Sequence, residues 1–226
     1  MSPGTRLAAR WLALTLGLGA SAARAGDDGG GRPAIASAGL FAAGAATAFA
    51  AHEGCHLATN LALGNVPRLE PVRFGGFLPF FTIDHGISCT GDRCVRRDGS
   101  TFGPGRPGLF LILTAGFQCQ HVGNEAILSS APDLRRQDAP FRTGMLAFNT
   151  LASVAYVAAD WGGFQPDQGD LAGLRRDAGA PRHLFNGLLL GVALLDAARF
   201  VWPDVEWLAW TSRSLKLGAG GVVLTL

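Results

Sequence analysis

The sequence predicts an all-α, polytopic helical membrane protein with four to five transmembrane helices after an N-terminal signal. Hydrophobic residues make up 48% of the 226 residues, and charged residues only 16%. Soluble domains usually carry about 25% charged residues. Long apolar runs alternate with polar connections rich in proline, glycine and arginine. A chain in lipid must satisfy its backbone hydrogen bonds internally, and because these runs are continuous rather than alternating, they indicate helices rather than a barrel.

The first 25 residues have the pattern of an export signal. Arg6 and Arg10 precede the apolar stretch WLALTLGLGA, and the small-residue site Ala23-Arg24-Ala25 follows it. The same segment also fits an uncleaved N-terminal anchor. In both cases residues 26–226 are expected to form a single helical membrane domain, in a multi-pass protein of the bacterial inner membrane.

Five apolar segments follow the signal. A spanning helix needs about 20 mostly apolar residues, and the first four segments meet that length. Arg213 and Lys216 interrupt the fifth. Abundant alanine and glycine would let these helices approach closely in a bilayer. The segments cover approximately residues 34–64, 108–128, 143–161, 184–202 and 207–226.

The charged residues indicate the kind of partner to expect. The formal net charge is +2, and the basic residues lie mainly in the connections between apolar runs. No basic stripe is interleaved with aromatic residues, so no nucleic-acid partner is expected. The lipid bilayer is the predicted partner.

Cysteines and arginines give competing predictions of orientation. Cys89 and Cys94 share a polar loop and would form a disulfide in an oxidising compartment. Cys55 and Cys119 lie in apolar segments, where cysteine usually acts as a small hydrophobe. Six arginines in residues 65–107, against three in the next connection, place this loop in the cytoplasm if the signal is cleaved. That compartment is reducing, which argues against the disulfide, and the arginine count receives the greater weight.

His52-Glu53-Gly54-Cys55-His56 is an HExxH motif inside the first apolar segment. On a helix, positions i and i+4 share a face, so both imidazoles can bind one zinc ion. Glu53 can act as general base on a bound water, because zinc lowers the pKa of that water to about 7. We therefore predict Zn²⁺ as cofactor, His52 and His56 as ligands and Glu53 as the catalytic residue. The alternative is a pair of interior histidines that bond to neighbouring helices.

The residues alone leave the third ligand open. Catalytic zinc sites commonly use two histidines and a carboxylate. The carboxylates in or beside the later apolar segments include Glu125, Asp160, Asp167, Asp170 and Asp196.

A polar stripe marks the second apolar segment. Gln118, His121 and Glu125 recur at i, i+3 and i+7 and so share one helical face. Such a stripe should face the bundle interior or a water-filled cavity. It would supply a ligand, orient the motif histidines, bind a substrate backbone or form a structural network between helices.

The stretch HEGCHLATNLALGNVPRLEPVRFGGFLPF resembles the site-2 protease family of intramembrane zinc metalloproteases. That family also places HExxH on an apolar helix, followed by small residues and a hydrophobic hairpin rich in glycine and proline. The later stretch TAGFQCQHVGN is similar to the family's Ala-Gly-Pro segment, with Phe117 in the proline position. The resemblance implies a zinc-dependent intramembrane metallopeptidase that hydrolyses a membrane-protein or peptide substrate in or near the bilayer.

In that family the third ligand is an aspartate in an Asn…Asp-Gly context near a later helix. Here Asn149 precedes Asp160, Asp167 and Asp170, but no Asp-Gly occurs at those positions. Asp170 ranks first because GDLAGL puts it at a helix start, and Asp167 ranks second. Asn149 or Gln118 is expected to hold the substrate strand or stabilise the oxyanion.

A second likeness supplies an alternative ligand. GNEAIL looks like the downstream Asn-Glu-Ala motif of thermolysin-type proteases and of membrane proteases that cleave prenylated substrates, which would make Glu125 the third ligand. Leu128 and Ser129 stand where those families have a small residue and an aspartate. Two alternatives to a peptidase remain: a non-proteolytic membrane scaffold or regulatory protein of the same fold, and a small transporter whose polar residues line a pathway.

Overall fold

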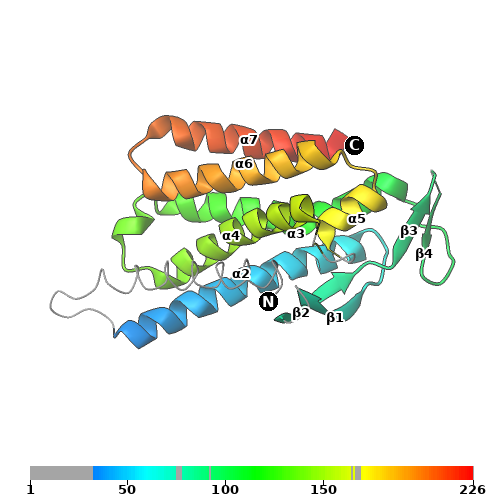
Figure 1. Ribbon diagram of the computed structural model, residues 1–226, viewed down its shortest axis with the longest axis horizontal. Helices are drawn as coiled ribbons and strands as arrows, with labels where there is room; N and C mark the ends of the chain where they lie inside the picture. The colour runs from blue at the N-terminus through cyan, green and yellow to red at the C-terminus, as the bar shows by residue number, and fades with distance from the viewer. Residues whose placement is uncertain (1–32, 75–77, 92, 164, 166–168, 226) are drawn as a thin grey trace.

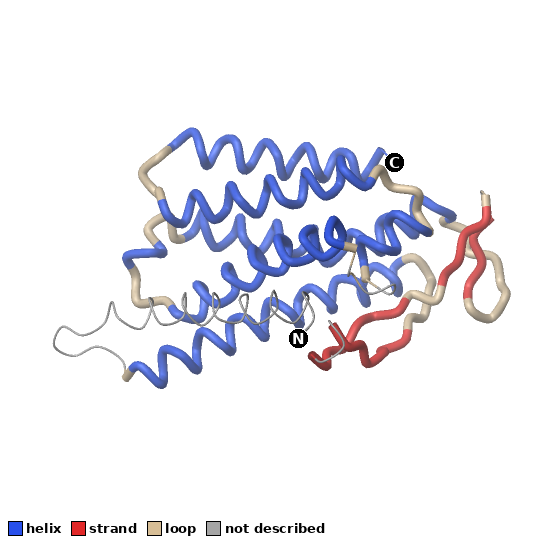
Figure 2. The backbone as a smooth tube through the Cα atoms, in the orientation of Figure 1, coloured by secondary structure: helices blue, strands red, loops and turns tan. Residues whose placement is uncertain are grey.

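The computed structural model describes residues 33–74, 78–91, 93–163, 165 and 169–225, and it is mostly helical (Figures 1 and 2). The predicted signal, residues 1–25, and the candidate ligand Asp167 lie outside the described residues. The helices are α2 Ala34–Ala62, α3 Gly105–Ser130, the 3-10 turn η1 Leu134–Arg136, α4 Pro140–Gly162, α5 Asp170–Arg176, α6 Arg182–Val201 and α7 Glu206–Thr225.

The five long helices form a bundle (Figure 1). Helix α2 packs on α3 and α4, and α6 packs on α4 and α7. Local signals delimit α4, because Pro140 begins it and Gly163, with a left-handed φ of 70°, caps its end. The short helix α5 lies beside the strands at one end of the bundle, which we call the hairpin end (Figure 1).

Two β-hairpins between α2 and α3 correct the all-α prediction (Figure 2). Both pairs are antiparallel, and Cys89 lies opposite Cys94 in the second. Gly86 and Gly91 adopt positive φ values of 61° and 59°, which glycine tolerates without strain, and so allow the chain to turn. The strands are β1 Arg68–Phe74, β2 Leu78–Asp84, β3 Ile87–Thr90 and β4 Arg93–Arg96.

Glycine lets α2 and α4 cross with their backbones in contact. A Cβ atom on Gly44 would overlap the carbonyl group of Phe141, and one on Gly144 would overlap the carbonyl group of Phe41. This is the close approach that small residues were predicted to allow. The buried residues of α2 form a single stripe at intervals of four: Gly44, Ala48, His52, His56 and Asn60.

Two described helices, α2 and α6, are long and apolar enough to cross a membrane, judged by length and composition alone. The predicted four to five spans are not reproduced by that measure. Helices α3, α4 and α7 do not qualify, and the polar residues of α3 between Gln118 and Glu125 illustrate why.

We expect Gly44→Ala to destabilise the protein, because the added methyl group has no space against the backbone of α4. Overpacking of this kind costs about 1–3 kcal/mol. Gly39→Ala is the matched control on the same helix, since nothing lies within 4 Å of its added Cβ. Its better helix propensity should stabilise the helix by up to about 1 kcal/mol. Denaturant unfolding in detergent measures both, and equal stabilities would contradict the close crossing.

Candidate metal centre

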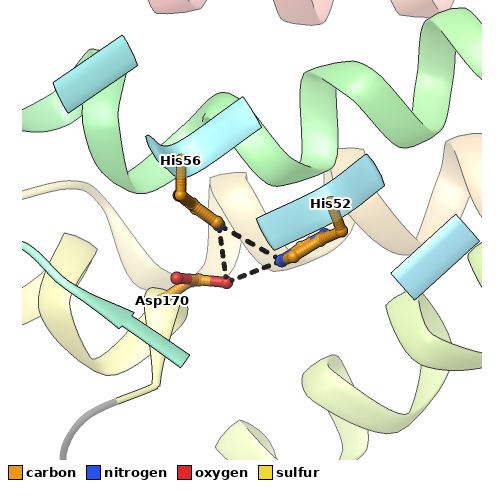
Figure 3. A group of neighbouring side chains, drawn as sticks. All are labelled: His52, His56 and Asp170. Atoms are coloured by element: carbon orange, nitrogen blue, oxygen red, sulfur yellow. Dashed lines mark hydrogen bonds and ion pairs between the residues drawn. The ribbon is translucent and has the colours of Figure 1, made fainter. Parts of the chain in front are cut away.

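His52, His56 and Asp170 converge on one point, although Asp170 follows His52 by 118 residues (Figure 3). The Nε2 atoms of His52 and His56 lie 3.2 Å apart. Asp170 Oδ2 lies 3.2 Å from His52 Nε2 and 3.4 Å from His56 Nε2. Ligands arranged tetrahedrally about 2.0–2.1 Å from a zinc ion lie about 3.3–3.4 Å from one another. The three atoms therefore fit three corners of a tetrahedral zinc site.

A backbone carbonyl sets the tautomer of His56. Its Nδ1 lies 2.7 Å from the carbonyl oxygen of Ile112 in α3, so the protonated Nδ1 donates this hydrogen bond. In the neutral ring Nε2 is then an acceptor, and it faces the carboxylate of Asp170. Two acceptors this close need a cation or a proton between them. Metal-binding histidines usually have such a carbonyl partner on the other ring nitrogen.

Gly116 of α3 makes room for both ligand nitrogens. A Cβ atom at this position would lie 2.5 Å from Nε2 of His52 and 2.5 Å from Nε2 of His56. The imidazoles therefore pack directly on the α3 backbone. Phe117 meets the His52 ring edge-on at 5.5 Å, and the Tyr156 ring stacks beside it at 6.4 Å, which further restricts its orientation.

Glu53 lies beside the three ligands rather than among them. Its Oε2 accepts the backbone N–H of Ile83 in β2 at 2.9 Å. The side chain is half-buried and within electrostatic range of both imidazoles and Asp170. The first hairpin thus holds this carboxylate next to the group.

Asp170 is ionised at neutral pH, as a metal ligand must be. Burial opposes the charged form, but in the metal-free protein the positive charge that the imidazoles of His56 and His52 carry when protonated outweighs it and holds the pKa of Asp170 well below its usual range. Its side chain is only 13% exposed. Among the described residues, this is the one group of three or more histidine, cysteine or acidic side chains arranged to hold a metal.

Glu125, the alternative third ligand, does not belong to this group among the described residues. Its two carboxylate oxygens are occupied by Arg199 at 2.6 Å, Arg213 at 2.8 Å and Lys216 at 2.9 Å. Asp160 is also engaged away from the group, by Arg175 and other donors.

The predicted substrate-binding residues do not contact the group in the described structure. Asn149 donates to Asn124 at 2.8 Å, and Asn124 donates to Asp196 at 2.9 Å. Gln118 points toward α7, where its Oε1 lies 4.0 Å from the position of a Cβ on Gly220. Their substrate-binding role stays a prediction.

The cysteines form two disulfides, and none is free. Cys55–Cys119 joins α2 to α3 beside the histidines, with Cα atoms 6.5 Å apart, and Cys89–Cys94 joins β3 to β4. Both differ from the prediction, which treated the first pair as small hydrophobes and argued against the second bond. Disulfides persist in oxidising compartments, so the Cys89–Cys94 bond argues against the cytoplasmic placement of residues 65–107 that the arginines predict.

No family model, curated protein or solved structure matches the chain. Sequence reasoning missed the parts of this site that act through the backbone: the carbonyl of Ile112 and the N–H of Ile83. Gly116 carried a signal, because it lies in the TAGF stretch singled out above.

We expect Gly116→Ala to weaken zinc binding by about 10–100-fold, the range typical of groups that orient metal ligands. The methyl group would displace both ligand nitrogens. Gly123→Ala is the control on the same helix, because its added Cβ meets only Asn149 Nδ2, at an ordinary 3.7 Å. Competition with a chromophoric chelator measures both. Wild-type affinity in the Gly116 variant would contradict the geometry described here.

His85 should make stability depend on pH. Its Nδ1 accepts the N–H of Ile87 at 2.9 Å, and burial lowers the pKa of His85 to about 4, although Asp177 and Asp170 act in the opposite direction. Between about pH 4 and 6.5 the unfolded chain binds a proton that the folded chain does not, so stability rises with pH across that window. The effect is at most about 3 kcal/mol.

His85→Asn should flatten this part of the stability profile while leaving its shape above pH 7 unchanged. Unfolding of both proteins by denaturant from pH 4 to pH 8 measures the difference. Parallel profiles throughout would show that His85 does not titrate in this way.

Proposed function

We propose that the chain is a zinc-dependent metallopeptidase that hydrolyses peptide bonds in or near a lipid bilayer of the bacterial inner membrane. The observation that carries the proposal is the three-atom ligand set of His52, His56 and Asp170, with Glu53 held beside it. Two histidines and a carboxylate, with a glutamate next to the first histidine, make up the ligand and base set of catalytic zinc peptidases.

Each residue of the site has a distinct task. His52, His56 and Asp170 would hold the metal, and bound zinc would lower the pKa of a water to about 7 and polarise the peptide carbonyl. Glu53 accepts a proton from the attacking water and later delivers it to the leaving amine. Ile83 keeps the Glu53 carboxylate in position, because its N–H bonds one oxygen and leaves the other available.

Exposed apolar surface supports the membrane assignment. Only 11% of the most apolar stretch of α2 is buried, although this helix carries both motif histidines. Leu57 and Leu61, beside the motif, are 40% and 54% exposed. A contiguous exposed apolar face is typical of surfaces that contact lipid or another protein.

Tryptophans near both ends of the bundle support several spans. Trp161 is exposed at the end of α4 near α5, and Trp202, Trp207 and Trp210 are exposed around the turn from α6 to α7. Tryptophan is enriched at membrane–water interfaces. Helix α4 has 23 residues, a length of about 34 Å, against a hydrocarbon core of about 30 Å. We infer that α3, α4 and α7 accompany α2 and α6 through the bilayer.

Two substitutions separate metal binding from catalysis. Glu53→Gln should retain zinc and lower the cleavage rate by about 10²–10⁴-fold, because the proton acceptor is lost. Asp170→Asn should weaken zinc binding by at least about tenfold. Asp98→Asn is the control. Asp98 is an exposed residue of the turn after β4 that accepts the N–H of Ser100, and its substitution should change neither property.

The assay is cleavage of a mixed library of single-span peptides in detergent, followed by mass spectrometry, with zinc measured on the same samples. Full cleavage by the Glu53 variant would rule out the peptidase. A wild-type protein that binds zinc and cleaves no peptide would favour the non-proteolytic scaffold.

A further inference from the structure

We propose that Asp160 is a positioning residue of the metal centre, which fixes the rotation of α5 through Arg175 and thereby aims Asp170 at the two histidines. The inference rests on the proposed zinc site and adds the part of the fold that assembles its third ligand. Asp160 is 3% exposed and lies at the end of α4. It is not one of the three ligand residues, and its side-chain hydrogen bonds within the described structure go to Arg175, Arg182 and Asn186.

The third ligand depends on an element that cannot stand alone. Asp170 is the first residue of α5, a helix of 7 residues. Isolated helices of that length have negligible stability in water, so tertiary contacts must hold this one. A metal ligand has to be placed to within about 0.5 Å. The contacts of α5 therefore decide whether the site forms.

Apolar packing holds α5 against α3 but does not fix its rotation. Leu171 and Leu174 are buried, and a Cβ atom on Gly173 would lie 2.8 Å from Leu113 Cδ2. The hydrophobic effect is not directional, so this packing constrains the rotation of a short helix less tightly than a hydrogen bond does. A directional contact on another side of α5 is needed to fix that rotation.

Asp160 supplies the directional contact. Arg175 donates to its Oδ1 at 2.6 Å, while Arg182 and Asn186 of α6 both donate to its Oδ2 at 2.7 Å. The carboxylate, near the end of α4, therefore joins that helix both to α5 and to the start of α6. Arg175 follows Asp170 by five positions, or about 140° around the helix. Fixing Arg175 at Asp160 thus sets where Asp170 points.

The role of Asp160 requires both oxygens of its carboxylate to accept hydrogen bonds. A carboxylate can accept from all three donors, whereas the amide of an asparagine has a single acceptor oxygen. Asp160→Asn would leave at least one donor without its partner. Arg175→Gln is the more selective change, since it releases α5 and leaves the bonds from Arg182 and Asn186 in place.

The experiment compares zinc affinity of the full-length protein and four variants in detergent, by chelator competition. Arg175→Gln and Asp160→Asn should each weaken zinc binding by about 10–100-fold, and Arg175→Lys should recover part of the loss. Arg176→Gln is the matched control. It removes a neighbouring arginine that is 57% exposed and pairs with Asp177, and it should stay within about threefold of wild type.

A spectrum separates positioning from general stability. With cobalt in place of zinc, the wild-type protein should show the intense visible bands of tetrahedral coordination, and Arg175→Gln should weaken or shift them. The metal-free Arg175 and Arg176 variants should melt at similar temperatures. If Asp160→Asn does not fold, the Arg175 comparison still decides.

The outcomes distinguish the two proposals. Wild-type zinc affinity and an unchanged cobalt spectrum in Arg175→Gln would overturn the positioning role while leaving the metal centre intact. Equal losses in Arg175→Gln and Arg176→Gln would also overturn it. A wild-type protein that binds neither zinc nor cobalt would overturn the proposed function, and the positioning role with it.

Discussion

The candidate metal centre depends on one packing constraint, the contact of the histidine face of α2 with the backbone of α3 at Gly116. His52 and His56 lie where a side chain on Gly116 would otherwise be, and Ile112 accepts the Nδ1 proton of His56. On another part of α2, Gly44 sits against the backbone of α4. Helix α2 is therefore fixed between two helices by close backbone contacts. Asp170 can meet the two imidazoles only if α2 is held in this position.

The sequence predicts the local half of the site and leaves most of the distant half open. A spacing of four residues puts His52 and His56 on one helical face, whatever fold surrounds them. The structure brings Asp170 to this pair, the aspartate that GDLAGL placed at a helix start. Its rival Glu125 is the alternative carboxylate that the GNEAIL stretch suggests, ranked below Asp170. Only the structure shows that cations from α6 and α7 occupy its oxygens.

The hairpins and the disulfides mark where sequence reasoning failed, for physical reasons. The strands are short, and Pro71 and Pro79 interrupt the alternation that would reveal them. Cys55 and Cys119 are 64 residues apart, and no local pattern shows that α2 and α3 bring them together. Backbone partners such as the N–H of Ile83 are invisible in principle, because every residue except proline offers the same group.

The charges of α7 explain how a segment that looked broken can belong to the bundle. Lys216 is 9% exposed at its side chain and lies 2.8 Å from Asp196 and 2.9 Å from Glu125. Arg199 of α6 meets the same glutamate at 2.6 Å. Buried charges are tolerated when they are paired, in membranes as in soluble proteins. The cation at Lys216 thus faces the interior of the bundle, and the polar stripe predicted on α3 supplies its partner. A count of charges along α7 treats it as a poor span. Pairing answers that objection for Lys216, whereas Arg213, which also pairs with Glu125, keeps a side chain that is 43% exposed.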